Sequence, residues 1–358
     1  MLFIFSIGTI SKAVDPPLSV VLPQSIFICT GRRFIVHTAR IRHDYPLAVT
    51  TNRKTSVKFS VWPSPERSWS DVRDLALYAD SNGWYSLWYA DHFMPNDEST
   101  STKDGDVFEC WSMISAIAAI TQDLRIGSLV SPTTFRHPTV LANIAATIDQ
   151  ISNGRLTLGI GAGWQVNEHL AYGVDLLEGK ERVDRFEEAI QIVTSMLRNN
   201  RTTFIGQHFS ITDAPCQPRP IQTPLPIMVG TGGPRMSKIT ARYANEWNTW
   251  GNVPTATERV ETFARACESV NREWADIHKS VQAMFFLVDD QETIEKIRKV
   301  APSDRSIIGS NDHIIDQIGQ LIELGFDEII VPDFTLGKDP QSRIDSYEKI
   351  RTEILSCF

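Results

Sequence analysis

The glycine-rich stretch from Ser152 to Trp164 holds the residues of this chain that most strongly suggest a ligand site. Gly159, Gly161 and Gly163 alternate with other residues at the end of a short apolar strand. Because glycine has no side chain, the backbone at such a strand end can approach a ligand closely. The pattern predicts a site for a planar cofactor. The alternative is that these glycines only let a following helix pack close to the strand.

The glycine spacing argues against a dinucleotide site of the Rossmann type. Gly159-x-Gly161-x-Gly163 is not the GxGxxG pattern. Asp184 lies about twenty residues further on, but it falls in a helical stretch, whereas a ribose-binding acid belongs at the end of the next strand.

A second group of reactive residues ends an earlier apolar strand, which closes with Tyr89-Ala90-Asp91-His92-Phe93. Histidine titrates near neutral pH and can exchange a proton with an alcohol or a carbonyl group. The adjacent Asp91 could bind a ligand donor or tune the histidine. A helix cap beside a buried histidine is the alternative interpretation.

The turn from Gly230 to Arg235 joins a strand to a helix whose first turn contains Pro234. Free backbone N–H groups at a helix start bind phosphate, and Gly232 with Gly233 allows close approach. Arg235 or Lys238 could add positive charge. Glycine-rich turns precede many helices, so an ordinary turn remains the alternative.

These motifs need a scaffold that brings strand ends together, and the chain after Val57 alternates short apolar strands with amphipathic helices. The predicted strands are 57–62, 84–90, 124–130, 155–160, 226–229, 246–249, 282–288 and 327–331. The predicted helices are 71–81, 108–121, 139–151, 182–197, 235–243, 255–274, one after 291, 312–324 and 342–355. Strands each followed by a helix favour a closed (β/α)8 TIM barrel, in which chemistry lies at the carboxyl ends of the strands.

Composition narrows the class of protein. A formal charge of -8 argues against a nucleic-acid-binding protein. The 5 cysteines are scattered and lack CxxC spacing, which indicates a reducing, cytoplasmic compartment without disulfides. No HExxH or similar spacing occurs, so we expect no metal site.

Residues 1–56 differ from the rest of the chain and are predicted to form a poorly ordered N-terminal extension to a single domain, 57–358. The alternatives for this segment are strands or a targeting segment. Leu2 to Ile10 is apolar, but no basic residue precedes it and no cleavage site follows it, which is unlike a signal peptide. It is too short to span a bilayer, so no membrane association is expected.

Taken together and in order, the motifs resemble the luciferase-like monooxygenase superfamily, and most closely its branch that uses the deazaflavin coenzyme F420. The resemblance covers about residues 57–331. The matching segments are Asp91-His92-Phe93, Arg136-His137-Pro138, Ser152 to Gly163 with Trp164 and Glu168, Val229 to Pro234, and Arg242 to Asn248.

The resemblance implies a TIM barrel with an insertion, here 201–224, in which 204–209 is interpreted as an added hairpin. It also implies that Asp91 contacts the cofactor, that His92 is catalytic, and that a non-prolyl cis peptide at Ser128–Leu129 lies beneath the deazaflavin. The remaining cofactor-binding residues that it implies are Ala162, Gly163 and Asn167 at the ring or its side chain, and Gly232 and Gly233 at the tail phosphate.

One residue departs from the pattern. Sugar-phosphate dehydrogenases of this branch carry a catalytic glutamate just after the glycine run, where this chain has Trp164. Their substrate and acid–base pair therefore do not transfer.

The resulting hypothesis is an F420-dependent oxidoreductase that moves a hydride to or from a small organic substrate while His92 moves the matching proton. A homodimer is possible, as in the family. The first alternative is an FMN-dependent monooxygenase that uses reduced flavin and oxygen. A barrel that binds flavin without catalysis, or a hydrolase, is the second.

Overall fold

The computed structural model describes residues 57–96 and 100–358. The predicted poorly ordered extension, 1–56, lies outside the described residues. Within them, eight parallel strands form a closed barrel, because β3 pairs with both β2 and β5 and β1 pairs with β13. The barrel strands are β1 (Lys58–Trp62), β2 (Ser86–Tyr89), β3 (Arg125–Ser128), β5 (Leu156–Gly161), β8 (Ile227–Gly230), β9 (Glu246–Trp250), β10 (His278–Gln282) and β13 (Glu328–Pro332).

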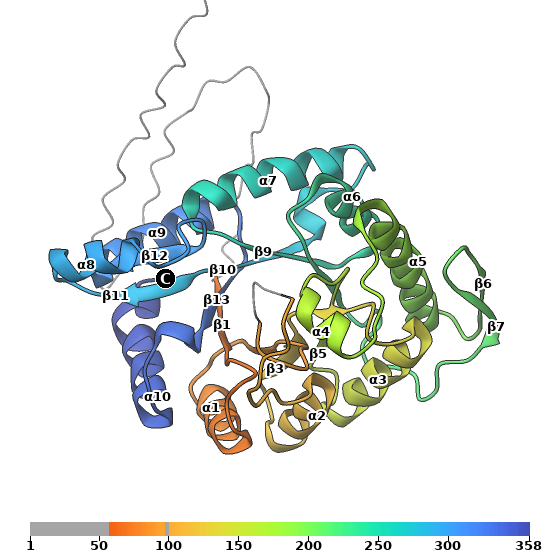
Figure 1. Cartoon of the computed structure of the whole chain (residues 1–358), viewed down its shortest axis with the longest axis horizontal. Coiled ribbons are helices and arrows are strands. Elements are labelled where there is room, and N and C mark those ends of the chain that lie inside the picture. Colours follow the sequence, from red (N-terminus) through yellow and green to blue (C-terminus); the bar gives the residue numbers. More distant parts are fainter. Residues whose placement is uncertain (1–56, 97–99) are drawn as a thin grey trace, which may run out of the picture.

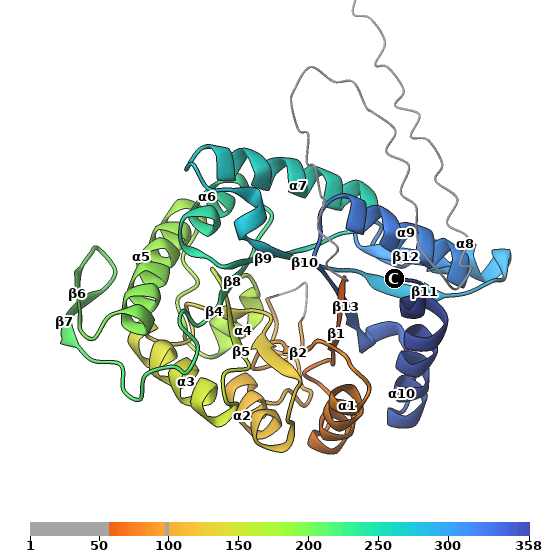
Figure 2. The ribbon, with the colours of Figure 1, turned by 180° about the vertical axis from the view of Figure 1, so that it is seen from behind.

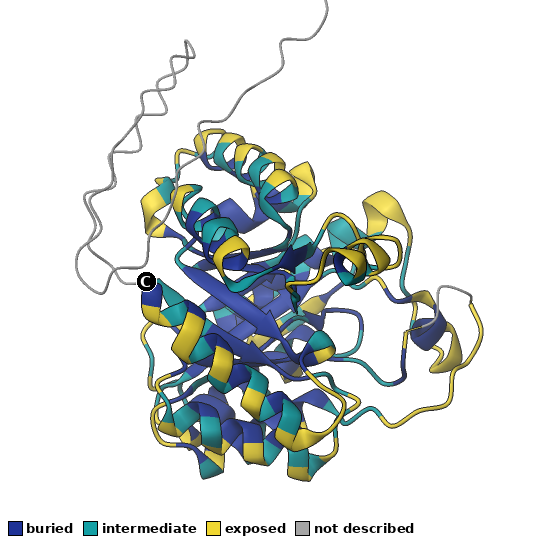
Figure 3. Cartoon of the chain, turned by 90° about the vertical axis from the view of Figure 1, so that its left-hand side faces the viewer, coloured by how far each residue is buried: buried dark blue, intermediate teal, exposed yellow. Residues whose placement is uncertain are grey.

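Helices surround the barrel, as the views from the two sides show (Figures 1 and 2). They are α1 (Trp69–Ser81), α2 (Cys110–Ile120), α3 (Pro138–Ile151), α5 (Gly179–Arg198), α6 (Pro234–Tyr243), α7 (Val253–Glu268), α9 (Asn311–Glu323) and α10 (Pro340–Lys349). In α5 the buried Phe186, Ile190, Val193 and Leu197 follow the helical repeat, so one apolar stripe faces the strands. Figure 3 shows the strands buried and the outer helix faces exposed. The predicted TIM barrel is confirmed.

The added hairpin is also present. β6 (Thr202–Ile205) pairs antiparallel with β7 (Ser210–Ala214), and the pair projects from the barrel beyond α5 (Figure 1). Glu188 of α5 holds the turn, because its carboxylate accepts hydrogen bonds from the backbone N–H groups of Gln207, His208 and Phe209 at 2.7–3.1 Å.

The predicted seventh barrel strand, 282–288, was wrong. The barrel strand is β10, which ends at Gln282, and the apolar run after it forms β11 (Met284–Leu287), paired with β12 (Ser306–Gly309) in a separate sheet. β10 was missed because it is largely polar: Ser280 and Gln282 bond the buried Asn248, and His278 bonds Glu328. The predicted helix 255–274 ends earlier, at Glu268.

Shorter elements complete the chain. They are β4 (Ser131–Pro132), α4 (Val166–Ala171), α8 (Gln291–Arg298) and the short helical turns η1 (Trp274–Asp276), η2 (Asp333–Thr335), η3 (Ile350–Ile354) and η4 (Leu355–Cys357). Of these, α4 and η2 carry residues of the site described below.

A buried polar cluster lies where β1, β10 and β13 begin. Glu328 accepts hydrogen bonds from Ser60 at 2.5 Å, from Trp88 at 2.8 Å and from Nε2 of His278 at 2.8 Å. Burial opposes the charge of His278, but the hydrogen bond and the charge of Glu328 outweigh it and raise the pKa of His278. Burial alone would raise the pKa of Glu328. The hydrogen bonds from His278, Ser60 and Trp88 and the charge of His278 outweigh burial and lower that pKa.

This pair predicts a pH-dependent stability. The stabilisation from His278 is complete below its unfolded pKa of 6.5 and is lost as pH rises through the higher folded pKa. The stabilisation from Glu328 is present above 4.5 and is lost as pH falls through the lower folded pKa. We expect His278→Gln to cost about 1–3 kcal/mol near pH 6 and less as pH rises towards 9. Urea unfolding across this range measures it, and an equal cost at both ends would contradict the argument.

Candidate active site

A pocket of about 1020 Å³ opens at the carboxyl ends of the barrel strands. The ends of β1, β2, β3, β8, β9, β10 and β13 all contribute to its lining. Of the residues predicted from the sequence, the pocket is lined by His92, Leu129, Gly232 and Gly233, whereas its lining does not include Asp91, Ser128, Ala162, Gly163 or Asn167.

His92 is fixed by a buried carboxylate. Nδ1 of His92 lies 2.9 Å from Oε1 of Glu168, and the other carboxylate oxygen accepts the backbone N–H of Phe93 at 2.8 Å. Glu168, on α4, is 0% exposed. Because Nδ1 is occupied, Nε2 is the ring nitrogen left for a ligand, and His92 can give or take a proton there. The rings of Trp164 and His92 pack nearly perpendicular to each other, with 5.6 Å between their centroids.

Glu168 was absent from the predicted site residues. The sequence placed it in a matching segment, but its partner lies 76 residues away along the chain, so no local pattern pairs the two. The available signal was a carboxylate in the first turn of the helix that follows a glycine-rich strand end.

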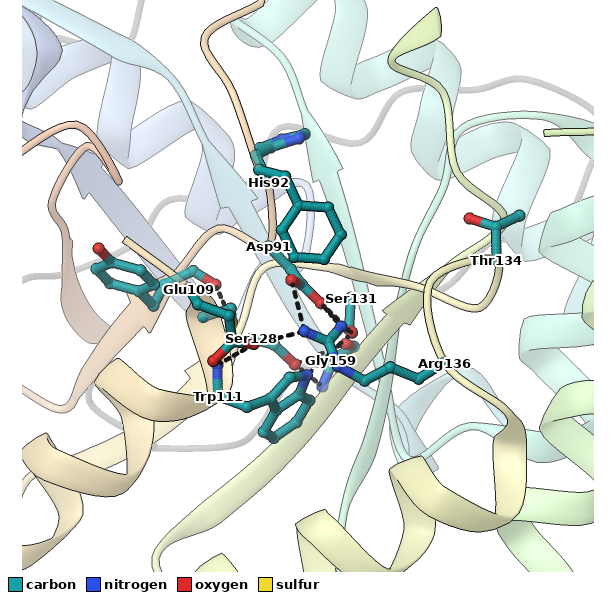
Figure 4. Close-up of polar contacts among 12 residues, drawn as sticks. Asp91, His92, Glu109, Trp111, Ser128, Ser131, Thr134, Arg136 and Gly159 are labelled. Carbon is teal, nitrogen blue, oxygen red and sulfur yellow. Dashed lines mark hydrogen bonds and ion pairs between the residues drawn. The ribbon is translucent and has the colours of Figure 1, made fainter. Parts of the chain in front are cut away.

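Asp91 lies below the pocket in a charged cluster. Its carboxylate is 0% exposed, contacts Arg136 at 2.6 and 3.3 Å, and accepts a hydrogen bond from Ser131. Figure 4 shows Asp91 directed toward Arg136 and Ser131, while the His92 ring points away from them. Arg136 also binds Glu109 at 2.5 Å. We therefore expect Asp91 to support the strand end that carries His92, and not to touch a ligand.

The charges of this pair are costly to bury and stabilise each other. Burial raises the pKa of Asp91, and Arg136 opposes that rise. Burial also works against the charge of Arg136, but Asp91 outweighs it and raises the pKa of Arg136. We take the carboxylate as ionised, because both of its oxygens face donors of a permanently charged guanidinium.

The predicted cis peptide at Ser128–Leu129 was wrong by one residue: the non-prolyl cis bond joins Leu129 to Val130. Ser128 still belongs to β3, where its hydroxyl donates to the Gly159 carbonyl at 2.7 Å and accepts the Gly159 N–H at 3.1 Å. These two hydrogen bonds hold Ser128 in β3, so the strand ends only after this residue. Leu129 and Val130, which follow it, line the pocket.

Two glycines of β5, Gly159 and Gly161, leave space for the chain where it passes from Ser128 to Val130. A Cβ on Gly159 would lie 1.8 Å from the Ser128 carbonyl oxygen, and one on Gly161 would lie 2.7 Å from the Val130 side chain. Gly159 and Gly161 thus allow a close approach of the neighbouring strand end. Gly163 has φ of 90°, a conformation that favours glycine.

Asn167 holds the chain after His92. Its buried side-chain amide donates to the Pro95 carbonyl at 3.1 Å and to the Met94 sulfur at 3.3 Å. Ala162 is half-buried and packs against the core. These two residues shape the pocket through the segments that they contact.

The turn from Gly230 to Gly233 has free space beside its backbone and a positively charged side chain in contact with it. Gly233 caps α6 without a side-chain hydrogen bond, and a Cβ there would meet no atom within 4 Å. Arg259 of α7 donates to the Gly232 carbonyl at 2.6 Å. Arg235 turns outward to Asp184 and the Lys180 carbonyl. The cation at this turn is therefore Arg259, which the sequence did not reveal because it lies on the next helix.

Comparison with known proteins places this architecture in a family. The family model for luciferase-like monooxygenases matches residues 54–302. The chain belongs to the luciferase-like monooxygenase family.

Two relatives of similar sequence carry the same name. This luciferase-like chain is 27% identical over 296 residues to an F420-dependent glucose-6-phosphate dehydrogenase of Amycolatopsis mediterranei, covering 73% of this chain and 87% of the relative. It is 30% identical over 241 residues to the enzyme of the same name from Kineococcus radiotolerans, covering 64% and 68% of the two chains.

Solved structures agree on the luciferase-like fold. An F420-dependent secondary alcohol dehydrogenase in complex with an F420-acetone adduct superposes with a TM-score of 0.72 at 17% identity, covering 84% of this chain and 99% of that one. A long-chain alkane monooxygenase gives a TM-score of 0.68 at 14% identity, covering 84% and 92%.

Within residues 57–96 and 100–358 of this luciferase-like chain, no helix combines the length and apolar character needed to cross a membrane. No three or more His, Cys, Asp or Glu side chains gather there into a group that could hold a metal ion.

Proposed function

We propose that this luciferase-like protein is an F420-dependent oxidoreductase that transfers a hydride between the deazaflavin and a small organic substrate. The observation that carries the proposal is the position of His92, which faces a large pocket with one ring nitrogen held by Glu168 and the other left for substrate. The names of the relatives at 27–30% identity support the choice of cofactor.

The residues of the pocket fit this cofactor. A volume of about 1020 Å³ is at the upper end of the usual range for ligand pockets, enough for a tricyclic ring with a substrate above it. Leu129 and Val130 offer an apolar surface for the ring. The turn at Gly232 and Gly233, with Arg259 behind it, offers N–H groups and a positive charge for the tail phosphate.

When bound, F420 accepts or supplies the hydride. This chain's own part is to hold the substrate oxygen at Nε2 of His92, which takes the hydroxyl proton in oxidation and returns it in reduction. Glu168 keeps the imidazole in place and stabilises the positive charge that appears when Nε2 is protonated.

Anaerobic turnover tests this function. Purified protein mixed with oxidised F420 and a series of secondary alcohols is expected to bleach the deazaflavin absorption without oxygen. Turnover only with reduced FMN and oxygen would replace the proposal by the monooxygenase alternative.

Gly233→Ala tests the assignment of the turn. The added methyl group meets no protein atom, so the free energy of unfolding should stay unchanged. It would stand where the phosphate of the cofactor approaches the backbone, so the Kd for F420 should rise roughly tenfold, which is about 1.4 kcal/mol. Fluorescence titration measures the Kd, and thermal unfolding of the same variant is the control. An unchanged Kd would remove the turn from the binding site.

A further inference from the structure

One side of the pocket is an aromatic wall formed by Trp62, Trp250 and Phe334. Trp62 ends β1, Trp250 ends β9 and Phe334 lies in η2 directly after β13, so three strand ends supply the rings. The Trp62 ring lies between the other two, with centroids 5.2 Å from Trp250 and 5.0 Å from Phe334.

This wall offers apolar surface to a ligand. Phe334 is 38% exposed although it lines a pocket, and Trp164, beside His92, is 57% exposed. Exposed aromatic side chains in a concave site mark a place where an apolar ligand displaces water. The strand that carries Trp62 pairs with the strand that leads to His92, so the wall and the imidazole border one space.

The arginines of the same pocket already have partners inside the protein. Arg67 bonds the buried Asp333 at 3.1 Å, and Arg305 bonds Asp304 through two contacts of 3.0 Å. Arg259 bonds the glycine turn. Among the described residues, no lysine lines the pocket. Arg259 is the cation assigned to the cofactor phosphate, so a phosphorylated substrate would have to take Arg67 or Arg305 from its carboxylate partner. An uncharged substrate leaves these ion pairs in place.

We infer that the substrate is an uncharged alcohol, or the carbonyl compound formed from it, whose apolar body lies on the aromatic wall and whose oxygen meets Nε2 of His92. This inference rests on the proposed function. In oxidation the carbinol C–H bond would break, and F420, held at the Leu129–Val130 surface and the glycine turn, would accept the hydride with both electrons of that bond. The hydroxyl proton passes to His92 and then to water, and a C=O bond forms.

Calorimetric titration of the cofactor-free protein with 1-indanol and with glucose 6-phosphate tests the substrate class. We expect 1-indanol to bind more tightly. Phe334→Ala and Trp250→Leu should each weaken its binding about tenfold while leaving the Kd for F420 within twofold. Val300→Ala, an exposed apolar position away from the pocket, is the matched control and should change neither affinity.

The outcomes separate this inference from the proposed function. Tighter binding of glucose 6-phosphate, or unchanged 1-indanol affinity in both wall variants with unfolding temperatures like that of the parent, would overturn the substrate class even if F420 binds. Failure of F420 to bind would overturn the proposed function, and the 1-indanol titration would still decide what the wall binds.

Discussion

His92→Gln should lower kcat for anaerobic alcohol oxidation by about 10²–10⁴-fold, the usual contribution of a positioned acid–base group. Glutamine can still bond Glu168 but cannot accept and release the substrate proton at neutral pH. The Kd for F420 should stay nearly constant, because the proposed contacts of the cofactor are the Leu129–Val130 surface for its ring and the glycine turn for its tail phosphate. Stopped-flow absorbance gives kcat, and fluorescence titration gives the Kd.

Glu168→Gln is the matched variant for His92. It keeps the shape of the residue but removes the negative charge that supports protonated His92, and its single amide oxygen cannot accept from both the imidazole and the Phe93 N–H. We expect a smaller fall in kcat than for His92→Gln, with KM for the alcohol nearly unchanged and a modest fall in the thermal unfolding temperature. A His92→Gln enzyme that retains most of its kcat would show that the proton moves through another group.

Asp91→Ala should lower the free energy of unfolding by about 3–5 kcal/mol, the cost of leaving a buried charge without its partner. Arg136 would keep Glu109, which is partly exposed, as its ion-pair partner, and a long contact of 3.5 Å to Ser131. Its half-buried guanidinium would lose its two contacts with Asp91. Urea unfolding measures this loss. The fall in the free energy of unfolding should be larger for Asp91→Ala than for any substitution of a residue that lines the pocket.

A double mutant distinguishes pairing from simple packing at Asp91. Arg136→Met alone should also destabilise the protein, and Asp91→Ala combined with Arg136→Met should cost less than the sum of the two single losses. If the free energy lost in the double mutant equals the sum of the two single losses, the Asp91–Arg136 ion pair does not stabilise this strand end. If instead Asp91→Ala weakens F420 binding in a protein of normal stability, Asp91 contacts the cofactor as the family resemblance implies.

The barrel could be predicted because its signal is local and repeated. Short apolar strands alternate with amphipathic helices, and the observed boundaries of α3 and α6 differ from the predicted ones by a single residue at one end. β10 was missed for a physical reason: His278, Ser280 and Gln282 bond other polar groups of the barrel, so this strand lacks the apolar pattern that marked the others.

The site could be predicted only in part because several of its contacts join residues far apart in sequence. His92 could be named from its position at a strand end, but its partner Glu168 could not. Arg259 meets Gly232 across 27 residues, while the nearer Arg235 is held at the surface by Asp184. The cis bond was displaced by one residue, since the hydroxyl of Ser128 keeps that residue in its strand. The homodimer and the cytoplasmic location stay predictions.

Titration of the purified protein with oxidised F420 and, separately, with oxidised FMN decides which cofactor the pocket takes. We predict that F420 fluorescence is quenched to saturation, that FMN binds more weakly, and that Gly233→Ala raises the Kd for F420 about tenfold. Tight binding of FMN with no response to F420, or no binding of either molecule, would contradict this prediction.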